Sequence, residues 1–292
     1  TSEEATVKSL AASGELTMSS QFQSPDTYKA WVDMGRFKMV SQNTGTAFYL
    51  KLNTKVAPTD DIHIRRALAL ATDYDTIRQV IFPGGVLSTP LPKAFAAYHN
   101  GDIPEPKFDM AGAKAEIAQS KYSGAPIPIT LGYVAGTGFE EEISLLMQSN
   151  LEKLGFVVMQ AADPWNRITE IAGKVETTPA VNQIFFGPTY PSPDSMFFTQ
   201  YHSKAAGTWA SMEWVNDPDV DAMIDAARAT GDIAEQAKIY KKLQAKLDDM
   251  KPDVYLLTQT VQHAMDQCLT GFNAVPMQSF DYDFTRYQWT CK

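Results

Sequence analysis

The residues best suited to bind a solute cluster between positions 185 and 214. Eight of these thirty residues are aromatic, whereas aromatic residues make up 11% of the whole chain. They are Phe185, Phe186, Tyr190, Phe197, Phe198, Tyr201, Trp209 and Trp214. The sequence Gly-Pro-Thr-Tyr-Pro-Ser-Pro-Asp at 187–194 interrupts the cluster, and its three prolines predict a stiff loop that cannot continue a strand. Most of these aromatic residues are expected to pack in the core, while Tyr190 on the loop is expected to face a ligand.

Motifs for phosphate and calcium binding are incomplete. Gly136-Thr137-Gly138 precedes a predicted helix, but the third glycine of a dinucleotide-binding loop is missing, and acidic residues follow where a phosphate would bind. Four aspartates between 217 and 225 have the spacing of a calcium loop, but Ala222 stands at its glycine position and Arg228 at its final glutamate position. We interpret these aspartates as acids at a helix N-terminus.

Residues for catalysis or metal binding form no recognisable pattern. The histidines are never three or four residues apart, so no helix face carries two of them; they are His63, His99, His202 and His263. Neither Gly-x-Ser-x-Gly nor His-Glu-x-x-His occurs. The sequence therefore predicts no metal, no cofactor and a protein that is not an enzyme.

The chain has only two cysteines, Cys268 and Cys291. A disulfide between them would close a loop of about 23 residues and contribute about 3 kcal/mol in the chain-entropy model. Such a bond requires an oxidising compartment. Two unpaired cysteines are equally compatible with the sequence.

The elements that position the aromatic loop alternate between strand and helix. Apolar alternation predicts strands at 128–134, 156–160 and 181–186, with helices at 138–154 and 165–174 between them. This order requires a mainly parallel sheet with right-handed crossovers, which is an α/β fold. The aromatic loop follows the carboxyl end of the third strand, where open α/β sheets bind ligands. The predicted ligand-binding residues are Phe186, Pro188, Thr189 and Tyr190.

The two ends of the chain have a different character. Strands are predicted at 15–19, 37–41, 46–52, 254–258 and 286–290, with few helices among them. Helix starts are predicted at Ser24-Pro25, at Asp61 and at Asp217-Pro218 from their capping residues. The centre of the chain is therefore expected to form an α/β unit, and the ends are expected to meet elsewhere.

Length and charge narrow the class of protein. The 292 residues allow about two domains. The net charge of −9 repels phosphate backbones, so nucleic acid is not an expected partner. The chain contains no apolar run long enough to span a membrane. It opens on Thr-Ser-Glu-Glu-Ala-Thr without the features of a signal peptide, which we interpret as part of a larger gene product.

The sequence resembles the C-terminal half of the family 5 extracellular solute-binding proteins, the peptide-type receptors of ABC importers. Four segments carry the resemblance in the order typical of the family. They are Leu10–Leu16 (LAASGEL), Thr46–Thr72 with its Asn-Thr and its Asp-x-x-Ile-Arg-x-Ala-Leu, Phe186–Phe198 with its Pro-Asp-x-x-Phe, and Asn216–Leu247. The match covers nearly the whole chain.

The resemblance implies a receptor with two lobes, of which this chain supplies the second. Residues 51–257 would form that α/β lobe, while residues 1–50 and 258–292 would be hinge-crossing segments that belong to a first lobe encoded upstream. The protein would act in the periplasm or outside the cell, close around a small-molecule solute, and deliver it to an ABC permease in the membrane.

The chain departs from the family where peptide termini are bound. In peptide-binding members an aspartate of the aromatic loop accepts the ligand ammonium, and the matching residue here is Thr189. Phe186 stands where the family usually has tryptophan, and Gln183 where some oligopeptide receptors have arginine. We therefore expect an oligosaccharide, a sugar conjugate or an anionic compound rather than a peptide with free termini. A dipeptide or oligopeptide receptor, an enzyme or sensor on a doubly wound domain, and a docking subunit without a small ligand are the alternatives.

Overall fold

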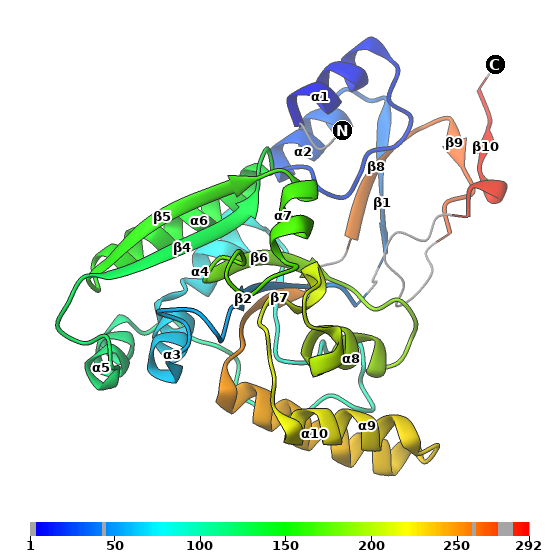
Figure 1. The fold of residues 1–292 in the computed structure, drawn as a ribbon. Coiled ribbons are helices and arrows are strands. Elements are labelled where there is room, and N and C mark those ends of the chain that lie inside the picture. Colours follow the sequence, from blue (N-terminus) through cyan, green and yellow to red (C-terminus); the bar gives the residue numbers. More distant parts are fainter. Residues whose placement is uncertain (1–3, 43–44, 259–260, 274–282, 292) are drawn as a thin grey trace.

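The computed structural model describes residues 4–42, 45–258, 261–273 and 283–291 and is built on a six-stranded sheet (Figure 1). The strands lie in the order β3 (Val86–Leu87), β7 (Asp253–Thr258), β2 (Ala47–Leu52), β6 (Val181–Phe186), β4 (Ile127–Val134) and β5 (Phe156–Asp163). β4 pairs in parallel with β5 and β6, and the other neighbours are antiparallel. The α/β class is confirmed, in the form of a mixed sheet whose parallel part is the predicted β-α-β-α-β unit.

Helices α6 (Gly138–Glu152) and α7 (Trp165–Ile171) connect the three parallel strands. Parallel neighbouring strands need a crossover connection, which is usually a helix. The alternation of strand and helix patterns along the chain therefore predicted these two helices between the three strands. β2 lies between β6 and β7, although the sequence associated it with the ends of the chain. The expected domain boundaries near residues 50 and 258 stay a prediction.

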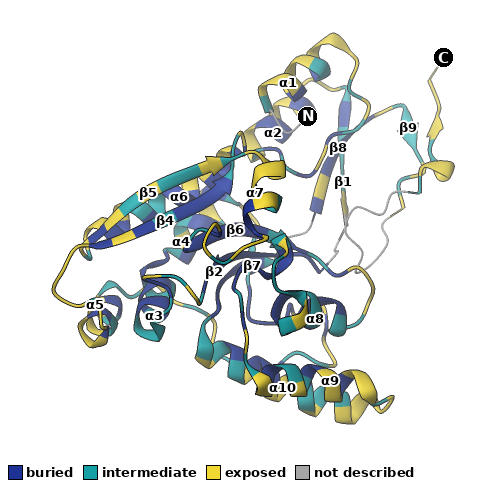
Figure 2. Ribbon diagram, in the orientation of Figure 1, coloured by how far each residue is buried: buried dark blue, intermediate teal, exposed yellow. Residues whose placement is uncertain are grey.

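Both faces of the sheet are covered, which explains why all six residues of β2 are buried (Figure 2). Phe48, Leu50 and Leu52 point into a core shared with α3 (Ile62–Ala71), α5 (Met110–Gln119) and α6. Ala47 and Tyr49 point into the opposite core. That core is shared with α8 (Asp194–Tyr201), α9 (Pro218–Ala229) and α10 (Ile233–Met250). Strand alternation thus divides one strand between two hydrophobic cores.

The predicted helix starts are confirmed by their caps. Asp61 accepts a hydrogen bond from the His63 amide at the start of α3, and Asp217 accepts from two amides at the start of α9. Ser24 caps α2 (Pro25–Asp33) in the same way. Each cap satisfies amides that have no partner inside their own helix.

A smaller unit is built from the two ends of the chain. α1 (Glu4–Ser13) and α2 pack on the antiparallel pair β1 (Phe37–Gln42) and β8 (Val261–Asp266), around Trp31 and Phe37. The strand predicted at 15–19 is wrong, because only a single bridge from Met18 to Met265 forms there. The helix α1 was not predicted, because its few buried apolar residues leave little periodic signal.

The C-terminal segment returns to the end of β8. Cys268 and Cys291 form a disulfide, and β10 (Gln288–Trp289) pairs with β9 (Leu269–Thr270) beside it. The strand predicted at 286–290 is therefore only two residues long. The bond closes the 23-residue separation considered above.

A charged cluster is enclosed in the core between β2 and α8. Lys51 Nζ donates to Gln200 Oε1 at 2.9 Å and to Glu213, and Asp253 Oδ1 lies 3.8 Å from the same nitrogen. The side chains of Lys51, Glu213 and Asp253 have no solvent exposure. Burial raises the pKa of both carboxyls. The neighbouring Asp253 raises the pKa of Glu213 further, and Lys51 lowers the pKa of both groups. Among the described residues, one cation thus faces two carboxyl groups in an interior that is closed to solvent.

Candidate functional site

A cavity of about 510 Å³ opens at the carboxyl ends of β4 and β6. Its lining residues come from both units of the fold and are Phe22, Val134, Thr137, Glu140, Trp165, Gln183, Ile184, Phe185 and Trp209. We call it the strand-end cavity. Open α/β sheets bind ligands at the carboxyl ends of their strands, so the position of the cavity agrees with the expectation from the sequence.

Aromatic rings form most of the walls of the strand-end cavity. Phe185 stacks on Phe48 with 4.0 Å between ring centroids, and Phe22 of the smaller unit lies 5.9 Å from Phe185. Trp165 and Trp209 meet edge to face at 5.3 Å. These rings present flat apolar surfaces, to which a planar or ring-shaped solute can bind.

Gln183 brings an unpaired polar atom to this apolar site. Its Nε2 donates to the backbone oxygen of Glu140 at 2.7 Å, which holds the side chain in place. Its Oε1 is buried and has no hydrogen-bond partner among the described residues. A buried amide oxygen without a donor is unfavourable by about 1–3 kcal/mol, so a donor on a bound solute would recover this free energy.

Glu140 is the one titratable side chain in the described lining of the strand-end cavity. It lies in the first turn of α6, only 3% exposed, and its Oε2 accepts from the Val134 amide at 2.7 Å. Burial raises the pKa of Glu140 to about 8, and the Val134 hydrogen bond opposes that rise. At neutral pH the carboxyl is therefore mainly protonated, and it can donate as well as accept a hydrogen bond.

A second cavity, of about 430 Å³, lies where the smaller unit meets the loop at 82–84. Phe139 and Phe82 line it, and Phe139 also contacts Phe185 of the strand-end cavity with ring centroids 5.7 Å apart. Gln21 lines it too, and both polar atoms of its buried amide lack a partner among the described residues. The two neighbouring cavities thus share a ring cluster and offer uncharged amide groups.

None of the four residues predicted to bind ligand is part of the lining of the strand-end cavity. Phe186 is buried and packs on Trp209, with ring centroids 5.8 Å apart, and Pro188 is buried as well. Thr189 and Tyr190 are exposed, and the Tyr190 hydroxyl donates to Asp194. Their role in ligand binding stays a prediction.

Most of the cavity lining was not predicted from the sequence. Gln183 was predicted only as a departure from the family, and Phe185 and Trp209 only as members of the aromatic cluster. Glu140 has the signal of an acid in the first turn of a helix, which does not reveal that it is buried. Phe22 and Trp165 are far from the aromatic loop in sequence, so no local pattern links them to it.

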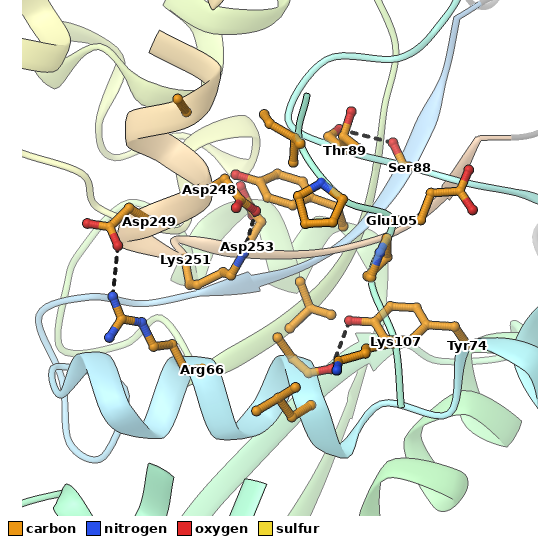
Figure 3. A pocket seen from close by; sticks show the side chains of 18 of the residues that line it. Arg66, Tyr74, Ser88, Thr89, Glu105, Lys107, Asp248, Asp249, Lys251 and Asp253 are labelled. Atoms are coloured by element: carbon orange, nitrogen blue, oxygen red, sulfur yellow. Dashed lines mark hydrogen bonds and ion pairs between the residues drawn. The ribbon is translucent and has the colours of Figure 1, made fainter. Parts of the chain in front are cut away.

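A larger cavity, of about 630 Å³, lies between α3, α10 and the segment at 88–107 (Figure 3). Its charged residues are largely paired with each other or with neighbours: Arg66 with Asp249, Lys251 with Asp248, Glu105 with Lys93, and Glu116 with His63. It lies toward the amino end of β7, which runs in the same direction as β6. It therefore lies at the opposite ends of the strands from the strand-end cavity.

The described residues contain neither a cluster of metal ligands nor a membrane-spanning helix. No group of three or more His, Cys, Asp or Glu side chains is placed to hold a metal ion in the part of the chain that the structure describes. Within the same residues, no helix combines the length and the apolar character needed to cross a membrane.

Comparison with known proteins decides the family. The family model for bacterial extracellular solute-binding proteins, family 5 (middle region), matches residues 1–208. The chain belongs to this family. The resemblance to the family is thereby confirmed, and three of the four segments that carry it lie within the matched residues. The family consists of solute-binding proteins of ABC importers.

Curated relatives are similar at low identity. The probable D,D-dipeptide-binding periplasmic protein DdpA of Escherichia coli K12 is 26% identical over 231 residues, covering 78% of this chain and 44% of that protein. The oligopeptide-binding protein AppA of Bacillus subtilis is 23% identical over 289 residues, covering 93% of this chain and 52% of that protein. The chain spans about half the length of the curated relatives it matches.

Solved structures share the fold. AppA of Bacillus subtilis, in complex with a nonapeptide, superposes with a TM-score of 0.87 at 19% identity, covering 100% of this chain and 59% of that one. AgaA of A. tumefaciens R10, in complex with agropinic acid, gives a TM-score of 0.81 at 22% identity, covering 95% and 56%. The periplasmic-binding-protein fold expected from the sequence is confirmed.

Proposed function

We propose that this chain is one lobe of the solute-capturing component of an ABC importer, and that the strand-end cavity is its share of the solute site. The observation that carries the proposal is a cavity at the strand ends that is walled by aromatic rings and lined by Gln183, whose buried Oε1 has no partner among the described residues. Family membership and the position of the cavity at the strand ends support it. The described part of the cavity lining holds one carboxyl and not the acid–base pair of a typical hydrolase, so it favours solute binding over hydrolysis.

The remainder of the protein would supply the opposing lobe, with residues 51–257 forming this lobe and the ends of the chain crossing the hinge. Solute binding would close the hinge, and closure is driven only by contacts that improve in the closed state. Both amide atoms of Gln21 and the Oε1 atom of Gln183 have no partner among the described residues, so they are groups that can gain such contacts. The closed receptor would then dock on its membrane permease.

The solute we propose is a neutral, hydroxylated molecule such as an oligosaccharide or a sugar conjugate. Neither the strand-end cavity nor the cavity beside Gln21 has a lysine or arginine in its described lining. A peptide carboxylate buried there would lack a cation from this lobe, and an unpaired buried charge is strongly unfavourable. Amide groups, a protonated carboxyl and aromatic rings instead complement hydroxyl groups and sugar ring faces.

A peptide is the second candidate, favoured by relatives whose names or solved complexes refer to dipeptides and oligopeptides. Thr189→Asp tests the loop alignment on which the choice depends. If Thr189 occupies the position that binds a ligand ammonium, the variant of the full-length protein gains affinity for trialanine in calorimetry. An unchanged affinity would remove that assignment.

The disulfide between Cys268 and Cys291 supports a periplasmic or extracellular location, because such bonds persist in oxidising compartments. The relative DdpA is named as a periplasmic protein. We accordingly propose that the protein acts outside the cytoplasm.

The test of the proposed function is calorimetry on the full-length protein that contains this chain, with raffinose, maltotriose and trialanine as probes. Trp165→Ala removes a ring that lines the strand-end cavity and is 44% exposed, so folding should tolerate its loss. We expect sugar affinity to fall about fivefold to tenfold. Trp289→Ala is the matched control, because Trp289 is 52% exposed on β10 and outside the cavity lining. Equal effects of the two variants, or binding of trialanine alone, would contradict the proposal.

A further inference from the structure

Glu140 and Gln183 are connected to each other in the wall of the strand-end cavity. The Gln183 amide nitrogen is occupied by the backbone oxygen of Glu140, so its oxygen is the atom left for a ligand. One Glu140 oxygen, Oε2, is occupied by the Val134 amide. The other, Oε1, has no hydrogen-bond partner within the described residues, and Glu140 lines the cavity. Each side chain thus has one polar atom fixed by the protein and one without a partner among the described residues.

The available atoms are complementary to a hydroxyl group. We propose, on the basis of the proposed function, that Glu140 meets the solute as an uncharged carboxylic acid whose Oε1 hydroxyl donates to the solute, while Gln183 Oε1 accepts from it. A solute hydroxyl both donates and accepts, so it satisfies both atoms. An ionised Glu140 would present two acceptors and no donor.

Among the residues that the structure describes, no cation pairs with Glu140. The charged and titratable groups on α6 and on the described elements beside its first turn are Glu4 and Lys8 of α1, Arg78 of the π-helix Ile77–Ile81, Tyr133 of β4, Glu141, Glu142 and Glu152 of α6 itself, Asp163 of β5, and Arg167 and Glu170 of α7. Glu4 Oε2 lies 4.0 Å from where a side chain on Gly138 would begin, and Glu4 pairs with Lys8 at 3.4 Å. Arg78 pairs with Asp75 at 2.7 Å and Arg167 with Glu170 at 2.8 Å.

The shift at Glu140 therefore comes from burial. Burial raises the pKa of this carboxyl to about 8, and the only opposing contribution is the Val134 amide. Most other carboxyls titrate below pH 5, and tyrosine, lysine and arginine near or above pH 10. Glu213 and Asp253, whose pKa burial also raises, are enclosed in the core and do not line the strand-end cavity. A change in affinity between pH 7 and pH 9 thus reports mainly on Glu140.

The inference predicts a solute affinity that falls as pH rises. If only the protonated form binds, the dissociation constant increases about tenfold from pH 7 to pH 9. Glu140→Gln keeps a donor in place of the acid hydroxyl and has no proton to lose, so its affinity should stay constant over this range. Glu142→Gln, at an exposed position close by on the same helix, should retain the pH dependence of the wild type.

The experiment is calorimetry of the full-length wild type and both variants with raffinose and maltotriose at pH 7, 8 and 9. A tenfold loss in the wild type and in Glu142→Gln, with a flat profile in Glu140→Gln, is the expected result. An affinity that rises with pH and is lost in Glu140→Gln would overturn the inference, because it would mean that the ionised carboxylate binds a cationic group. A pH-independent wild type would overturn it as well.

A second measurement separates this inference from the proposed function. Carbon NMR of the ligand-free protein labelled at glutamate follows the protonation of Glu140, identified by the signal missing from Glu140→Gln. We expect a midpoint near pH 8. A midpoint below pH 6 would overturn the inference even if the sugars bind. A midpoint near pH 8 with no sugar binding at any pH would instead contradict the proposed solute class, and the hydroxyl contacts with it.

Discussion

Glu140→Gln should stabilise the protein, and the gain should increase with pH. In the folded protein the pKa of Glu140 is raised from its ordinary 4.5 to about 8, because the carboxyl is buried at the strand-end cavity. The folded state therefore holds a proton that the unfolded state releases between these two values. Stability is present at low pH and is lost as pH rises through that window. A glutamine side chain at this position has no proton to hold, so the variant does not share this loss.

The magnitude follows from the two pKa values. Relative to low pH, proton linkage at Glu140 lowers the free energy of unfolding of the wild type by about 1 kcal/mol at pH 5 and by about 5 kcal/mol at pH 8.5. The free energy of unfolding of Glu140→Gln, measured against the wild type, should therefore rise by about 4 kcal/mol between pH 5 and pH 8.5. At low pH the two proteins should differ little, because a protonated glutamate and a glutamine have nearly the same shape and both can accept from the Val134 amide.

Urea unfolding followed by tryptophan fluorescence at pH 5, 7 and 8.5 measures this difference. Glu142→Gln is the control, because its exposed side chain should change stability by no more than a few tenths of a kcal/mol at each pH. Equal pH dependence in Glu140→Gln and the wild type would refute the reasoning, since it would show that Glu140 is ionised in the folded protein as it is in the unfolded one.

Three further changes in stability follow from buried contacts, all measurable by urea unfolding. Lys51→Met should lower the free energy of unfolding by about 3–5 kcal/mol, because it leaves two buried carboxyls without a cation. Lys29→Met, at an exposed ion pair, should lower it by under about 1 kcal/mol. Similar effects of the two variants would contradict this expectation. Arg65→Ala should lower the free energy of unfolding by about 2–3 kcal/mol, because Arg65 donates to two backbone oxygens. Arg66→Ala should lower it by under about 1 kcal/mol, because the partner of Arg66 is exposed. A larger effect of Arg66→Ala than of Arg65→Ala would be inconsistent with the structure. Reduction of the disulfide should lower stability by about 3 kcal/mol; no change on reduction would contradict a role in stability.

The parts of the fold that sequence could predict are those set by local patterns. The β-α-β-α-β unit follows from periodicity, and the starts of α3 and α9 follow from Asp61 and Asp217, because capping acts within one turn. The position of β2 in the middle of the sheet was not predictable, because it depends on pairing with β6 and β7 across more than a hundred residues.

The candidate site was predicted less well for the same reason. The strand end and its aromatic character were anticipated from the loop after β6. The cavity, however, is completed by Phe22 of the smaller unit and Trp165 of α7, which no spacing rule connects to that loop. Glu140 carries the sequence signal of a surface acid at a helix start, and only the tertiary packing that buries it changes its chemistry.

Hydrogen exchange of the full-length protein, with and without whichever of raffinose and maltotriose binds more tightly, tests most directly whether the strand-end cavity holds the solute. We predict slower exchange in peptides covering 131–143 and 181–188, which include Glu140 and Gln183, and unchanged exchange at 66–77 beside the larger cavity. Protection at 66–77 without protection at the ends of β4 and β6 would contradict the account.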